Sequence, residues 1–188
     1  MNRVHRNFSR RARVATGGAV LAVVALAGFG AVSANASASA TAPAAASADA
    51  PDRATTTSTH LTVDAATKAA QAALDAAEKE NQRVTVAVVD RNGNTIVTLR
   101  GDGAGPRSYE SAERKAFTAV AWNAPTSQLA ERLEQAPNLK DIPGTLFLPG
   151  GVPVTADKAP FAGIGVAGAP SGALDEKFAQ AGANAIAR

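Results

Sequence analysis

The sequence predicts an α+β domain of the α/β/α type, with a central antiparallel sheet covered by helices, behind an N-terminal leader. Three observations predict this class. Apolar segments with strand-like patterns come in pairs around turn residues, alanine-rich segments with helical periodicity separate the pairs, and one strand is apolar on both faces. A strand of that kind must be covered from both sides.

Residues 1–40 have the order of an export signal peptide. An arginine-rich start without acids precedes an apolar run and then small residues. The apolar run is too short to span a membrane, which takes about 20 residues. Arg10-Arg11 before a weakly apolar core favours the twin-arginine route, and an ordinary secretion signal with paired arginines is the alternative. Cleavage fits after Ala36 or Ala40, and the absence of cysteine excludes a lipid anchor.

The leader accounts for the basic character of the chain. It holds five of the 19 basic residues and none of the 16 acids, so the remainder carries 14 basic and 16 acidic residues, a net charge of −2. The charge therefore gives no reason to expect a nucleic-acid partner. The absence of cysteine excludes disulfides and thiolate metal sites. Residues 41–59 are rich in Ala, Ser, Thr and Pro and predict a disordered linker, and residues 60–188 suffice for one domain.

The segment 60–82 predicts the first helix. Thr62 is the expected N-cap, and Asn81 is expected to end the helix. Its alanines form a small-residue stripe that lets a helix lie close to a sheet. The members of this stripe are Ala69, Ala73 and Ala76 or Ala77.

Residues 84–89 and 95–100 predict a hairpin with Asn92-Gly93 in its turn. The first strand is apolar on both faces, so helices cover both, or another subunit covers one. The glycine-rich exit 101–106 lacks the Lys-Ser/Thr of a phosphate loop and is interpreted as the border of a ligand or subunit contact.

The rest of the chain alternates between helical and strand patterns. The glycines of the last strand predict that something bulky approaches its backbone. The expected elements are a helix over 108–123 capped by Ser108, a short helix over 126–135, a hairpin over 144–156 turning at Pro149-Gly150-Gly151, a buried strand over 161–170 and a C-terminal helix over 171–187.

Four blocks of the sequence carry a resemblance to a known family. They are VTVAVVDRNGNTIVTLRGDGA, SAERKAFTAVAWNAPTSQLA, LFLPGGVPV and GIGVAGAPSGALDEKFAQAGANAI. In this order, from about Leu61 to the end, they resemble the GlcG/HbpS-like family of small haem-binding proteins. With its export signal, the chain is most similar to the secreted, actinobacterial-type members. The resemblance implies a profilin-like α/β/α fold, haem as cofactor and assembly as a homo-octamer. It also implies a role in haem or iron handling, and an association with a membrane sensor histidine kinase during redox stress.

The residues give little choice of axial haem ligand. After the leader the chain has no Met and no Cys, and its one His is His60 at the domain edge. Many family members have a His after the turn glycine of the first hairpin, where this chain has Asn94. Tyr109 is a candidate because a phenolate can ligate ferric iron, and a half-buried aromatic at a helix start is the alternative.

The second predicted helix matches the family pattern A-x-x-K-A-x-T-A at Lys115 and Thr118. The resemblance implies that Lys115 pairs with a haem propionate and that the Thr118 hydroxyl contacts haem. The alternative is a solvated lysine and a threonine packed against the sheet. Arg107 is a second candidate partner for a propionate.

Asp75 and Glu78 stand three residues apart on one face of the first predicted helix. Paired carboxylate oxygens of this kind can bind iron ions at a surface. A solvated helix face is the alternative.

The sequence shows no nucleophile paired with a base, so no catalytic residues are predicted and the question of enzymatic activity stays open. Haem degradation would depend on bound iron rather than on a protein nucleophile. The leading hypothesis is a secreted, extracellular haem-binding accessory protein that senses haem or redox stress and modulates a membrane sensor kinase. The alternative is an oligomeric extracellular interaction module without physiological haem binding.

Overall fold

The computed structural model describes residues 49–187. The predicted leader and the first part of the predicted linker lie outside the described residues. Residues 51–60 are exposed and carry one short 3-10 turn, η1 (Asp52–Ala54). Within the described part of the chain, no helix is long and apolar enough to cross a membrane.

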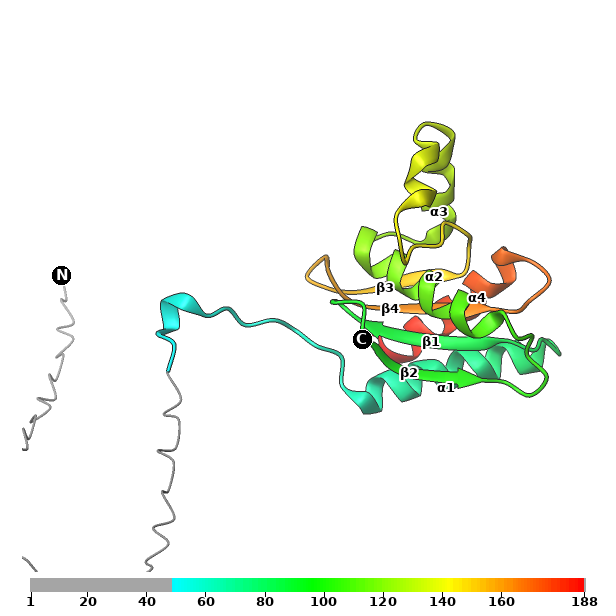
Figure 1. Cartoon of the computed structure of the whole chain (residues 1–188). Helices are drawn as coiled ribbons and strands as arrows, with labels where there is room; N and C mark the ends of the chain where they lie inside the picture. The colour runs from blue at the N-terminus through cyan, green and yellow to red at the C-terminus, as the bar shows by residue number, and fades with distance from the viewer. Residues whose placement is uncertain (1–48, 188) are drawn as a thin grey trace, which may run out of the picture. The chain divides into compact units, whose positions relative to one another are not determined.

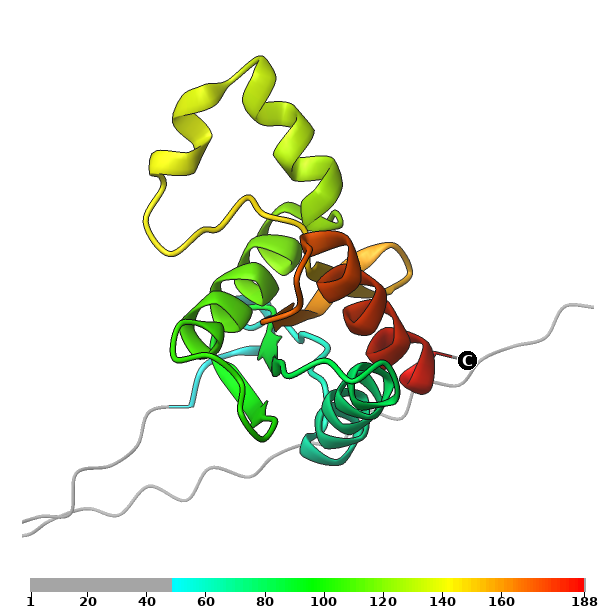
Figure 2. The ribbon, with the colours of Figure 1, turned by 90° about the vertical axis from the view of Figure 1, so that its right-hand side faces the viewer.

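The folded part has three layers (Figures 1 and 2). The sheet has the order β2-β1-β4-β3 with every neighbouring pair antiparallel, and α1 and α4 lie on one face while α2 lies on the other. The predicted α/β/α class is therefore confirmed. The elements are α1 (Val63–Lys79), β1 (Thr85–Asp90), β2 (Thr95–Arg100), α2 (Ser108–Trp122), α3 (Thr126–Glu131), η2 (Arg132–Glu134), η3 (Pro137–Asp141), β3 (Gly151–Ala156), β4 (Ala159–Ala167) and α4 (Gly172–Ile186).

The two-sided strand β1 lies at the centre of the fold, as its sequence predicts. Val86 and Val88 pack in the core formed with the alanines of α1 and with Phe178 of α4. On the opposite face, Ala87 and Val89 pack against α2. Helices of this one chain cover both faces, so no second subunit is needed to bury β1.

Helix α2 lies directly on the glycines of β4. A Cβ atom at Gly165 would be 2.5 Å from the backbone nitrogen of Ala116 and still closer to the carbonyl oxygen of Ala112. Gly163 meets the backbone of α2 at Ala116 in the same way. The predicted close approach to this strand is thus the approach of a helix, and it fixes where the side chains of α2 lie.

Two of the three predicted helix-end features hold. The Thr62 hydroxyl accepts from the Ala65 N–H, and Asn81 has a φ of 57° just beyond the end of α1. The predicted cap at Ser108 is wrong. Ser108 is already inside α2, and its hydroxyl donates to the Gly105 carbonyl and hydrogen-bonds with Thr85 across 2.7 Å.

The predicted hairpin over 144–156 is also wrong, because residues 145–150 form no strand. The Leu146 N–H donates to the Thr118 hydroxyl of α2 rather than to a neighbouring strand. The hairpin is β3–β4, and its turn is Asp157-Lys158, where both residues have a positive φ of 50° and 67°. Such a turn suits the twist of two strands but usually carries Asn or Gly, so its sequence signal is weak.

The segment 124–149, called here the arm, carries α3, η2 and η3 and extends away from the sheet (Figure 1). A small core of its own, made by Ala124, Leu129 and Phe147, supports it. The Phe147 ring packs edge-on against Trp122 with 5.6 Å between ring centroids. The part of the arm around Phe147 therefore packs against the end of α2. The arm also borders two pockets beside that helix.

Candidate functional site

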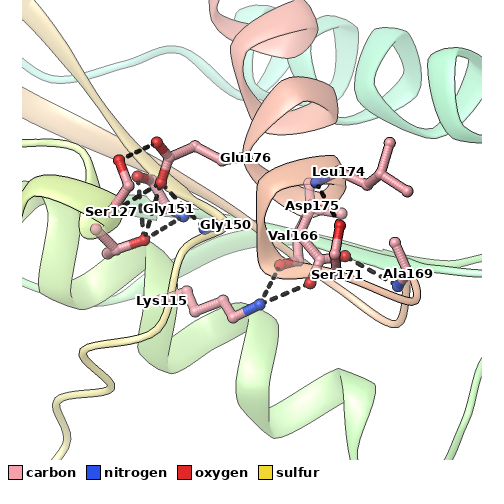
Figure 3. A network of polar contacts seen from close by, with 11 residues as sticks. Lys115, Ser127, Gly150, Gly151, Val166, Ala169, Ser171, Leu174, Asp175 and Glu176 are labelled. Atoms are coloured by element: carbon pink, nitrogen blue, oxygen red, sulfur yellow. Dashed lines mark hydrogen bonds and ion pairs between the residues drawn. The ribbon is translucent and has the colours of Figure 1, made fainter. Parts of the chain in front are cut away.

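Lys115 lies inside the fold and not on its surface. Its exposed fraction is 4%, and its Nζ atom donates to Asp175 Oδ2 at 2.7 Å and to the Val166 carbonyl at 3.1 Å (Figure 3). Asp175 Oδ1 accepts from the Ala169 N–H at 3.0 Å. The interpretation of Lys115 as a solvated helix lysine is therefore wrong.

Burial raises the pKa of Asp175 above its usual range, and the hydrogen bond and charge of Lys115, together with the Ala169 N–H, oppose that rise. Each carboxylate oxygen of Asp175 has a donor, as a buried ion pair requires. The pair joins α2 to α4 and is neutral as a unit.

This pair lies at the floor of a pocket of about 320 Å³, called here the Arg107 pocket. Arg107 is exposed at its border, and Leu146 and Leu148 of the arm contribute apolar surface. The structure thus brings together the two residues predicted to pair with propionates. Tyr109 is 46% exposed and does not line this pocket. The haem contacts of all three remain predictions.

Thr118 is fully buried and does not line the Arg107 pocket. Its hydroxyl donates to the Arg114 carbonyl at 2.7 Å and accepts from the Leu146 N–H at 2.7 Å. In this arrangement the hydroxyl fastens the segment before β3 to α2. A haem contact through Thr118 remains a prediction, and it requires this segment to move.

A second and larger pocket, called here the Phe117 groove, lies on the other side of α2. It measures about 470 Å³ and is bordered by Val89, Gly93, Thr95, Glu113, Arg114, Phe117, Pro143 and Gly144. The ring of Phe117 lies against Gly93, where a Cβ atom would be only 2.6 Å from it. Asn94, which stands where many family members have a His, directly follows that glycine.

Among the described residues, Arg114 is the one cation that borders the Phe117 groove, and Glu113 is the one anion. The Nη2 atom of Arg114 donates to the Thr145 carbonyl at 2.7 Å, and its Nη1 is 3.6 Å from Glu110. Its buried Nε has no hydrogen-bond partner among residues 49–187. Sequence reasoning missed both Phe117 and Arg114. The available signal was an aromatic residue outside the alanine stripe of α2, one turn from an arginine.

Asp75 and Glu78 both lie exposed on α1. Gln71 donates to Asp75 Oδ1 at 2.6 Å. Within residues 49–187, no three His, Cys, Asp or Glu side chains gather closely enough to hold a metal ion. Iron binding by these two carboxylates remains a prediction.

Glu176 holds the base of the arm. Its carboxylate accepts from the Ser127 N–H at 2.9 Å, from the Gly150 N–H at 3.2 Å and from the Ser127 hydroxyl (Figure 3). It thereby joins α4 to the start of α3 and to the start of β3. Nothing in the sequence pairs these positions, which lie 49 residues apart for Ser127 and Glu176.

Glu176→Ala is expected to loosen the arm without unfolding the sheet. The substitution leaves two partly buried N–H groups without acceptors, at a cost of about 1–3 kcal/mol. Hydrogen exchange at the Ser127 and Gly150 amides is expected to accelerate, while the amides of β1 keep their protection. Glu131→Ala, on the exposed face of the arm, is the matched control. Equal exchange in both variants would show that Glu176 does not hold the arm.

The fold and the two pockets beside α2 define a small three-layer α/β/α domain with ligand-sized pockets on two sides of its second helix. The chain belongs to the HbpS-like family, described as haem-degrading proteins, whose sequence model matches residues 61–184. The resemblance stated from the sequence is thereby confirmed.

The chain is also similar to solved structures and to a curated protein. A double mutant of HbpS from Streptomyces reticuli is 71% identical, with a TM-score of 0.76 over 78% of this chain and 100% of that one. A complex of PduOC with haem is 27% identical, with a TM-score of 0.63 over 68% of this chain and 96% of that one. An uncharacterized 15.0 kDa protein of Citrobacter freundii is 30% identical over 57% of this chain and 80% of its own length.

Proposed function

We propose that the chain binds haem and that the porphyrin occupies the Phe117 groove. The observation that carries the proposal is the meeting of an aromatic ring, apolar walls and an arginine whose buried Nε lacks a partner. A porphyrin needs apolar surface for its ring and cations for its propionates. Membership of a family described as haem-degrading, and a haem complex of the similar PduOC, support the assignment.

The groove offers haem no strong axial ligand. None of its bordering residues is a His, Met, Cys or Tyr. Apolar contact with Phe117 and ion pairing with Arg114 therefore supply most of the affinity, so binding is expected to be modest and readily exchangeable.

A hemin titration followed by Soret absorbance tests this proposal. Phe117→Ala and Arg114→Gln are each expected to weaken hemin binding by about tenfold or more, because one removes ring contact and the other a charge-assisted hydrogen bond. Arg132→Gln, an exposed arginine of the arm, is the matched control and is expected to bind like the parent.

The same titration addresses the residues predicted from the sequence. Loss of hemin binding in Arg107→Gln, with Phe117→Ala unaffected, would contradict the Phe117 groove and move haem to the Arg107 pocket. A parent protein without a saturable Soret shift would contradict haem binding altogether. The interaction module without physiological haem binding would then be the better account.

The proposal also covers export, assembly and signalling. We infer that the chain is exported by the twin-arginine route, assembles as a homo-octamer outside the cell, and modulates a membrane sensor kinase in response to haem or redox stress. Iron ions bound at Asp75 and Glu78 belong to the same proposal. Its support is the order of residues in the leader and the membership of the family.

A further inference from the structure

The Arg107 pocket has features that the proposed haem site does not use. The Lys115 ammonium has three N–H donors. Two of them have acceptors in the Val166 carbonyl and Asp175 Oδ2, and the third has no acceptor among residues 49–187. A buried donor without an acceptor is costly, so it indicates a ligand atom or a water molecule at this place.

The charge of the pocket favours an anion. Lys115 and Asp175 neutralise each other, and both oxygens of Asp175 already accept hydrogen bonds. Arg107 is the third charged residue of the lining, and it forms no ion pair within the described part of the chain. The pocket therefore carries one uncompensated positive charge.

Apart from Ser108 and Ser111, the remaining side chains of the lining are apolar, and they leave room for a small organic body. Pro106, Leu146, Leu148 and Ala167 line the pocket, and Leu148 is 54% exposed. Gly105 adds open space, because a Cβ atom there would have no heavy atom within 4 Å. A volume of about 320 Å³ suits a small molecule rather than a whole porphyrin.

We propose that the Arg107 pocket binds the carboxylate of an organic anion with an apolar body. The carboxylate accepts the third N–H of Lys115 and pairs with Arg107, while the apolar body lies against Leu146 and Leu148. A free carboxylic acid and a propionate arm of haem share this chemistry. Among the described residues, the evidence for this site is the free donor of Lys115, the unpaired charge of Arg107 and the apolar lining. It does not depend on haem in the Phe117 groove.

The test is a titration with 3-phenylpropionate followed by amide shifts in ¹H–¹⁵N spectra of the isotope-labelled protein. The acid is expected to shift the Ser111, Leu148 and Gly168 signals saturably. The neutral 3-phenylpropanamide is expected to bind at least about tenfold more weakly, because it lacks the charge-assisted hydrogen bonds. Equal binding of acid and amide would overturn the proposal.

Two variants test whether the acid binds in the Arg107 pocket, and neither alters the buried ion pair. Gly105→Leu puts a side chain into the open space and is expected to abolish the shifts, whereas Gly105→Ala fills little of it and serves as the matched control. Arg107→Gln is expected to weaken binding of the acid by about tenfold. Unchanged binding of the acid in Gly105→Leu would contradict the assignment to this pocket.

A hemin titration of Gly105→Leu distinguishes the two sources of the carboxylate. Weakened hemin binding would identify the occupant as a haem propionate. Unchanged hemin binding, with the acid lost, would identify a free carboxylic acid. If the acid does not bind to the parent and hemin binding is unchanged in Gly105→Leu, the anion site is wrong. The Phe117→Ala result decides the haem groove separately.

Discussion

Lys115→Met is expected to lower the free energy of unfolding by about 3–5 kcal/mol, because it leaves a buried carboxylate without its cation. Asp175 is 4% exposed, so its carboxylate is poorly solvated once the ammonium is lost. Methionine keeps most of the apolar stem of lysine, which confines the change to the charge. Urea unfolding followed by circular dichroism measures the loss.

The pH dependence of this variant has a definite sign. Burial already raises the pKa of Asp175, and removal of Lys115 removes the largest opposing contribution, so the pKa rises further in the variant. A raised pKa in the folded state stabilises at low pH and costs stability as the pH rises through it. The deficit of Lys115→Met is therefore expected to shrink as the pH falls towards about 3.9, the usual pKa of an aspartate.

A double variant serves as the control for the pair. In Lys115→Met with Asp175→Asn, the charge is gone and the amide oxygen still accepts from the Ala169 N–H. This double variant is expected to recover a large part of the lost stability. If Lys115→Met alone were as stable as the parent, the ion pair would not be what holds α2 to α4.

Gly165→Ala is expected to cost about 3 kcal/mol or more, because the added methyl group meets backbone atoms of α2 and not a movable side chain. The helix must then move away from β4, which opens the packing of Ala112 and Ala116 against the sheet. Thermal unfolding measures the loss as a lower midpoint. A midpoint within error of the parent would contradict the direct contact of helix and strand.

Gly105→Ala is the matched control for this substitution. Its Cβ atom has no neighbour within 4 Å, so the free energy of unfolding is expected to change by no more than about 0.5 kcal/mol. The comparison separates steric overlap at Gly165 from the general effect of replacing a glycine.

The fold follows from local patterns and so was predictable from the sequence. The two-sided β1 required cover on both faces. The alanine stripe of α1 and the glycines of β4 predicted that helices lie close to the sheet. The hairpin over 144–156 was not predictable in the same way. Its glycines suggested a turn, whereas the observed turn at Asp157-Lys158 is made by residues that rarely adopt positive φ.

The sites depend on contacts between distant segments, which local patterns do not reveal. Lys115 and Asp175 are 60 residues apart in the sequence. The helical pattern around Lys115 therefore gave no indication of its partner. Phe117 gains its groove only because the first hairpin and the arm both reach α2. Arg107 and Lys115 were singled out one by one, and they share one pocket because the arm and the start of α4 meet the same side of α2 there, through Leu146 and Asp175.

Paramagnetic broadening by ferric haem is the most direct test of haem in the Phe117 groove. Backbone amides close to the bound iron lose intensity in ¹H–¹⁵N spectra, and zinc protoporphyrin is the diamagnetic control. The proposal predicts selective loss at Gly93, Phe117 and Gly144, with Ser111 and Gly168 of the Arg107 pocket retained. Loss centred on Ser111 and Gly168, or uniform spectra with hemin and the zinc analogue, would contradict it.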